Sequence, residues 1–292
     1  MSFLQSLAQQ HPGMEHLSVW PRSVTHNAAL SEADTIDFVH TLNQQWRSLH
    51  HFDLALCGAE SHWVATWIQN LQLVALRDWR FRLSYNAIND RLDPIAPMMP
   101  CPSTLVGLHT LHMILGNRVL PDGLRAWRTW NELSLRDIRI TYSDVGMYLL
   151  WDVACLMRAS RHCIRSVTIE NQAPNPTAVD GKATAHTFQL PLCTCLRTFR
   201  LHHPITMCSI QRFLDMMPSS VYCLEVWIAD PCDGPPQTLR IPPSVKELRI
   251  HIPRLCSVAL SNVGWLGHAP TSWHIQHAQH RAVLESAVCR VV

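Results

Sequence analysis

Lysine is almost absent from this sequence of 292 residues. Of its 24 lysine and arginine residues only Lys182 and Lys246 are lysines, so arginine supplies nearly all of the positive charge. The formal net charge is only +2, which argues against a dedicated nucleic-acid binder, because such proteins usually carry a strong basic excess. Charged residues make up 16% and hydrophobic residues 47%, a composition that predicts a folded chain with a sizeable core.

The chain also lacks the sequence features of export and of membrane insertion. Its first residues contain no basic segment followed by a long apolar run, so we expect no secretory signal. The longest uncharged run, residues 94–117, is interrupted by three prolines and predicts a loop followed by a strand. The eleven cysteines have no paired spacing, which indicates reduced and mostly buried thiols. Cytoplasm or nucleus is therefore the expected location, and we expect no membrane partner.

Motifs of catalysis and cofactor binding are missing as well. The ten glycines form no serine elbow, dinucleotide fingerprint or phosphate loop. Asp152 falls within an apolar helical pattern, which favours a satisfied buried carboxylate over a general base. Arg161-His-Cys163 places a thiol beside a histidine, but adjacency in sequence does not align a catalytic pair. We predict no enzyme, no catalytic residues and no cofactor.

The histidines and cysteines invite a zinc hypothesis, which their spacing does not favour. The densest set lacks the paired spacing of tetrahedral zinc ligands, and it comprises Cys193, Cys195, His202, His203 and Cys208. His274, His277 and His280 would spread around a helix and read better as a solvated stripe. We expect no metal site.

What the sequence does contain is a recurring pattern, apolar-x-x-apolar-x-apolar, which we call the comb. Leu196–Leu201, reading Leu-Arg-Thr-Phe-Arg-Leu, is its clearest copy. Nine copies begin at Met14, Leu49, Leu76, Leu108, Leu135, Ile164, Leu196, Val221 and Val245. Successive starts differ by between 24 residues (221 to 245) and 35 residues (14 to 49). Leucine-rich repeats run roughly 20 to 29 residues, so this spacing predicts a slightly long and irregular array. A tenth copy is a possibility at Leu255.

Between combs the apolar period changes from two to 3.6, as a strand–helix repeat requires. Helices are predicted in five stretches: 3–13, 31–46, 61–71, 143–157 and 210–217, the last ended by Pro218. Proline- and glycine-rich segments at 93–103, 171–181 and 231–243 predict loops or returns poor in helix. The fold class predicted is α/β: a leucine-rich-repeat solenoid, an irregular horseshoe with a parallel sheet on its concave face.

We expect one continuous domain over residues 1–262, with about nine irregular repeats, and a C-terminal tail or capping helix over 263–292. The chain begins within a repeat, which suggests a truncated product or a partner that covers this end.

The combs at Leu196–Leu201 and Val245–Ile250, with the phrase from Phe3 to Leu17, resemble the leucine-rich-repeat portion of fungal F-box proteins. The likeness spans roughly residues 1–260, although the F-box itself, with its leading Leu-Pro element, is not present. The resemblance implies substrate recognition for a ubiquitin ligase. It also implies docking to a cullin-type ligase adaptor where an F-box is supplied upstream.

The combs further predict which side chains face solvent on the concave surface. One ladder would consist of Ser18, Asp53, Arg80, His112, Arg139, Thr168, Arg200, Glu225 and Arg249. The next would consist of Trp20, Ala55, Arg82, Ile114, Thr141, Glu170, His202, Trp227 and His251. Because arginine and tryptophan are enriched at binding hot spots, the candidate partner-binding residues are Arg80, Arg82, Arg139, Arg200, His202, Trp227, Arg249 and His251.

These residues predict a non-enzymatic protein–protein interaction module that binds a protein or an acidic or phosphorylated peptide. A free-standing repeat scaffold unrelated to ubiquitin is the alternative within binding proteins. An enzyme with an unrecognised site is the alternative from another class. Outward strand positions that merely tolerate charge remain the simplest explanation of the arginines.

Overall fold

A computed structural model describes residues 3–19, 32–57, 70–84, 106–115, 133–142, 147–172, 180–188, 190–228, 237–251, 263–266 and 272–276. The chain divides into two compact units, Met1–Asp144 (unit 1) and Val145–Val292 (unit 2), and each is considered by itself. Among the helices that the structure describes, none combines the length and apolar character needed to cross a membrane.

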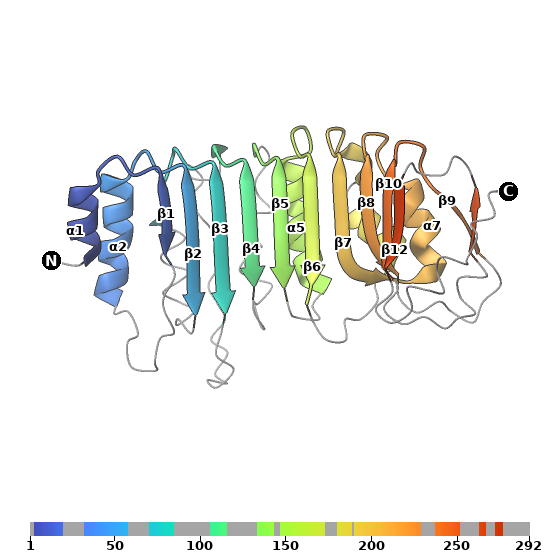
Figure 1. Cartoon of the computed structure of the whole chain (residues 1–292), viewed down its shortest axis with the longest axis horizontal. Helices are drawn as coiled ribbons and strands as arrows, with labels where there is room; N and C mark the ends of the chain where they lie inside the picture. Colours follow the sequence, from blue (N-terminus) through green and yellow to red (C-terminus); the bar gives the residue numbers. More distant parts are fainter. Residues whose placement is uncertain are drawn as a thin grey trace. The chain divides into compact units, whose positions relative to one another are not determined.

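Unit 1 contains a parallel sheet whose strands follow one another in chain order (Figure 1). The described elements are α1 (Phe3–Gln10), β1 (His16–Val19), α2 (Glu32–Gln45), β2 (His51–Cys57), β3 (Asp78–Ser84), β4 (Thr110–Leu115) and β5 (Asp137–Tyr142). Parallel neighbours in chain order require a crossover between every two strands, so unit 1 is a series of similar strand-and-return units.

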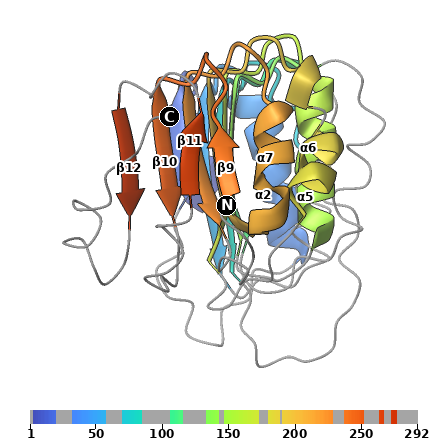
Figure 2. The ribbon, with the colours of Figure 1, turned by 90° about the vertical axis from the view of Figure 1, so that its right-hand side faces the viewer.

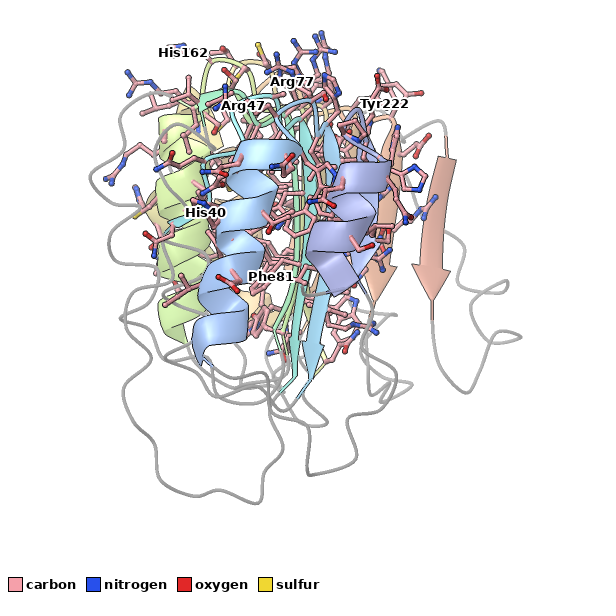
Figure 3. All side chains as sticks on the ribbon, turned by 90° about the vertical axis from the view of Figure 1, so that its left-hand side faces the viewer. His40, Arg47, Arg77, Phe81, His162 and Tyr222 are labelled. Carbon is pink, nitrogen blue, oxygen red and sulfur yellow. The ribbon has the colours of Figure 1, made fainter. Side chains whose placement is uncertain are left out.

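The combs supply the core of unit 1. Their second and third apolar positions align in register across β2 to β5, and these residues are Phe52, Trp79, Leu111 and Ile138, then Leu54, Phe81, Met113 and Ile140. All eight are buried. Helix α2 contributes Val39 and Leu42 to this core. Trp46, which follows the helix, is buried and donates its indole N–H to the carbonyl of His11 at 3.0 Å. Figure 3 shows Phe81 on the side of the strands that faces α2.

Unit 2 repeats the arrangement with more of its helices described. Its elements are α5 (Met147–Ala159), β6 (Ser166–Asn171), α6 (Gly181–Phe188), the 3-10 turn η2 (Leu190–Leu192), β7 (Thr198–Ile205), α7 (Met207–Asp215), β8 (Cys223–Ile228), β9 (Gln237–Arg240), β10 (Glu247–His251), β11 (Val263–Leu266) and β12 (Ser272–Gln276). Strands β6, β7, β8, β10 and β12 form a parallel sheet in that order, and β9 pairs with β11 separately.

The helices of unit 2 cover one face of its sheet (Figure 2). Helix α6 packs against both α5 and α7. Phe199 of β7 meets Phe188 of α6 edge-on at 5.9 Å and Phe213 of α7 at 6.0 Å between ring centroids. The comb residues of β7 therefore point toward the helices, and the alternate residues, such as Arg200, point to the opposite face. We call that opposite face the open face, since the described part of unit 2 places no helix on it.

The α/β class and the parallel strands built from the combs are confirmed. Helices expected at 3–13, 31–46, 143–157 and 210–217 correspond to α1, α2, α5 and α7. The helix expected at 61–71 lies outside the described residues except at its end, as do the tenth comb at Leu255 and the helical pattern of the expected C-terminal capping helix. Several described elements were not predicted. Helix α6 and the turn η2 follow the expected loop 171–181, and strand β9 lies within the segment 231–243, where a loop or a return poor in helix was expected. Strands β11 and β12 lie in the expected tail, where β11 pairs with β9 and β12 continues the sheet beside β10.

Candidate interaction surface

The open face of unit 2 carries a ladder of polar side chains from neighbouring strands. Thr168, Arg200, Glu225 and Arg249 pair in register across β6, β7, β8 and β10, and the backbone of His274 in β12 stands opposite Arg249. The first four residues belong to the first of the two ladders that the sequence predicts. His274 was expected on a helix together with His277 and His280, but it lies on strand β12.

Glu225 is the centre of this ladder. Its side chain is only 7% exposed, yet it lies among three basic groups. Its Oε2 lies 3.4 Å from Nε of Arg200 and 3.8 Å from Nη1 of Arg249, and its Oε1 lies 2.7 Å from Nε2 of His202. A buried carboxylate is costly unless it is paired and hydrogen-bonded, so these three neighbours explain how the strand tolerates it.

The sequence placed Glu225 in the ladder but not among the candidate site residues. Its role was missed because an outward strand position predicts a solvated charge. Here the long side chains of Arg200 and Arg249, one strand away on either side, cover it.

Beside Glu225 lies an aromatic pair. The imidazole of His202 stacks on the indole of Trp227 with ring centroids 5.6 Å apart and an interplanar angle of 14°. Trp227 pairs in register with His251 of β10, as the second ladder predicts. His202 does not stand opposite Trp227, because a bulge in β7 between Leu201 and Pro204 shifts the register and places Pro204 there. His202 therefore stacks on Trp227 from the preceding rung.

His203 lies in the core, at the inward position that the alternation of β7 gives it. His203 is 1% exposed, and its Nδ1 lies 3.1 Å from Nδ2 of Asn171, which is buried as well. Two consecutive histidines thus have opposite environments: His202 is partly exposed on the open face, and His203 is buried in the core.

Unit 1 has a comparable ladder. Ser18, Asp53, Arg80, His112 and Arg139 align across β1 to β5, and Arg82 aligns between Ala55 and Ile114. Nη1 of Arg80 lies 4.0 Å from Oδ2 of Asp53. Each unit therefore brings its predicted arginines onto one sheet face, and each includes an acidic residue on the same row.

Of the residues that were weighed as zinc ligands and not favoured, Cys193 and His203 are buried, whereas His202 lies on the open face. Burial raises the pKa of the Cys193 thiol to about 11, against the opposing effect of Arg161, so this sulfur stays protonated at neutral pH. The thiol of Cys195 donates to the carbonyl of His162 at 3.1 Å. Within the described ranges, no three Cys, His, Asp or Glu side chains converge as metal ligands.

No protein-family model and no curated protein sequence matches this chain. Any functional inference therefore rests on the geometry of the sheet faces.

Proposed function

We propose that the chain is a non-enzymatic protein-interaction module with a leucine-rich-repeat solenoid fold. The supporting features are parallel strands in chain order within each unit, and combs whose apolar residues form successive rungs of a core. A repeat array of this kind presents its strands as an extended binding surface.

The observation that carries the proposal is the Arg200–Glu225–Arg249 row. The side chains of Arg200 and Arg249 are 37% and 43% exposed, so both guanidinium groups are accessible while Glu225 holds one edge of each. An arginine fixed in this way loses less side-chain entropy when it binds a carboxylate or phosphate in a bidentate manner. With the Trp227 and His202 pair alongside, this face suits an acidic or phosphorylated protein segment.

In unit 1, the face that carries Arg80, Arg82 and Arg139 is proposed to contribute in the same manner. By the sequence resemblance, the module would select substrates for an F-box-type ubiquitin ligase. Co-purification with a cullin-type ligase after fusion of an F-box ahead of residue 1 tests that part. Partner capture without ligase association would favour a free-standing scaffold.

The test of the open face uses arginine-to-lysine changes, which keep the charge that Glu225 needs. We expect the double variant Arg200→Lys/Arg249→Lys to bind a fluorescein-labelled phosphoserine peptide flanked by aspartates about tenfold more weakly, because lysine lacks the bidentate fork. Fluorescence anisotropy measures this. Arg212→Lys, on α7 at the other face of the sheet, is the matched control. Equal affinity of the double variant and the wild type would refute the proposal.

A further inference from the structure

A second row of side chains in unit 2 lies at the edge of the sheet where the strands begin. It comes from the second position of each comb, between the buried first residue and the strand. The amide of Arg197 donates to the carbonyl of Arg165, that of Tyr222 to Arg197, and that of Lys246 to Tyr222, each at 2.8 Å. Four consecutive rungs thus carry Arg165, Arg197, Tyr222 and Lys246, and all four are exposed.

Apolar surface accompanies these cations. Tyr222 is 47% exposed, and Leu192, in the turn that precedes β7, is 49% exposed. The turns before β7 and β8 are in contact, since the hydroxyl of Ser220 donates to the carbonyl of Cys193 at 3.4 Å. Figure 3 shows Tyr222 and His162 at the end of unit 2 where its strands start.

The positive charge of this row is weakly balanced. The residues that follow Arg165 and Arg197 are Ser166 and Thr198, and within the described residues neither arginine is paired with a carboxylate. Lys246 is followed by Glu247, and its Nζ donates to the carbonyl of Pro243 at 3.1 Å. The side chain of Arg197 donates only a long bond, 3.5 Å, to the carbonyl of Ser220.

The same comb position in unit 1 is different. There Arg77 and Arg136 are each followed by an aspartate, Asp78 and Asp137. The positive charge without a following acidic residue is therefore specific to Arg165 and Arg197, and it does not follow from the repeat alone.

We propose that Arg165, Arg197, Tyr222 and Lys246, with Leu192, form a second interaction surface, the basic edge, which binds an extended acidic peptide segment that carries apolar side chains. It is distinct from the open face. Strands in a sheet lie about 4.8 Å apart, so Arg165 and Lys246, three strand spacings apart, are separated by roughly 14 Å along the edge. An extended peptide rises about 3.3 Å per residue, so acidic residues four positions apart match the two ends of the row.

A peptide fits this edge better than a nucleic acid. Only a few cations are present, the whole chain has a net charge of +2, and exposed Leu192 and Tyr222 sit among the cations. Nucleic-acid surfaces need many phosphate contacts and a strong basic excess.

The experiment measures binding of the full chain to a fluorescein-labelled ten-residue peptide of alternating glutamate and leucine. A glutamine–leucine peptide and a ten-nucleotide oligouridine serve as comparison probes. We expect Arg165→Glu/Arg197→Glu to weaken binding of the glutamate peptide about tenfold, because two exposed ion pairs become repulsions. Arg165→Gln/Arg197→Gln, which removes the charges without reversing them, should weaken it about threefold.

The control variant Arg212→Glu reverses one exposed charge on α7, outside the row, and should change affinity less than twofold, whereas Arg197→Glu alone should weaken binding clearly. A loss of binding in Arg200→Lys/Arg249→Lys as large as that in Arg165→Gln/Arg197→Gln would mean that the peptide binds the open face, and it would overturn the proposal. Equal losses in the basic-edge and control variants would overturn the proposal. So would oligouridine binding that is tighter than that of the peptide, or glutamine-peptide binding equal to that of the glutamate peptide.

Discussion

Replacing Glu225 by glutamine tests whether the row on the open face of unit 2 is a stabilising cluster or a set of independent surface charges. The change keeps the size of the side chain but removes the only carboxylate within 4 Å of Arg200, His202 and Arg249 among the described ion pairs. Removing one member of a fully buried ion pair costs roughly 3–5 kcal/mol, because the other charge is left buried. Here the arginine side chains are 37% and 43% exposed, so water can hydrate them once the carboxylate is gone. We therefore expect a smaller loss, about 1–3 kcal/mol.

Urea unfolding followed by far-UV circular dichroism measures the loss as a shift of the midpoint at constant slope. Asp180→Asn is the matched control, because it removes a carboxylate from an exposed position in the same unit. Asp180 Oδ1 accepts the Ala183 amide at 2.7 Å at the start of α6, and asparagine caps a helix equally well. A loss below about 0.5 kcal/mol for Glu225→Gln, equal to that of Asp180→Asn, would refute the clustered interpretation.

The contribution of each arginine follows from double-mutant cycles. Arg200 lies closer to Glu225 than Arg249 does, 3.4 Å against 3.8 Å, and is slightly less exposed. The coupling between Glu225→Gln and Arg200→Gln should therefore exceed that between Glu225→Gln and Arg249→Gln, with both in the range of about 0.5–2 kcal/mol. The reverse order would mean that distances in the row do not set its energetics.

Three further predictions concern other parts of the chain. Burial raises the folded-state pKa of Cys193 to about 11, above the ordinary thiol value of 9.0. Its stabilising contribution is therefore complete below pH 9 and falls by up to about 3 kcal/mol as pH rises to 11. The difference in unfolding free energy between wild type and Cys193→Ala should shrink over that interval, and a constant difference would contradict this. Burial lowers the pKa of His109 most, and the positive charge of Arg136 lowers it further. Arg136→Gln should therefore raise the pKa of His109 in an NMR titration. An unchanged or lower pKa would contradict the role given to Arg136. A Cβ on Gly107 would lie 2.7 Å from Nη1 of Arg77, which donates to the Gly107 carbonyl. Gly107→Ala should therefore cost about 1 kcal/mol in thermal unfolding, and less in an Arg77→Ala background; equal costs in both backgrounds would exclude this contact as the cause.

The parts of the fold that could be predicted are those that follow from the regular spacing of apolar residues. In each comb the first, fourth and sixth residues are apolar, and a strand sends alternate residues to opposite faces, so the combs alone identify the buried side of the strands that they form. Leu196, Phe199 and Leu201 are each 0% exposed, and Arg200 between them faces away. The alignment of the ladders follows from the same regularity.

The elements that were missed depend on single residues and not on a regular spacing of apolar residues. Helix α6 is only eight residues long and begins at Gly181 within a stretch whose prolines and glycines favoured a loop. Its usable indication was Asp180, whose carboxylate caps the first turn. Strand β12 carries no complete comb, and its pairing with β10 is visible only in the structure.

The bulge in β7 lies at Pro204, a position that no period marks. The described pairing of β7 with β6 ends at His202, so Pro204, which has no N–H to donate, is paired only with β8. The register with β8 shifts between Leu201 and Pro204, and Pro204 stands opposite Trp227. His202 keeps the outward direction that alternation gives it, bonds Glu225 and stacks on Trp227 from the preceding rung. The ladders were sufficient to predict that His202 and Trp227 share the open face, whereas the bond to Glu225 and the stacking geometry depend on side chains of the next strand, which no local pattern in β7 specifies.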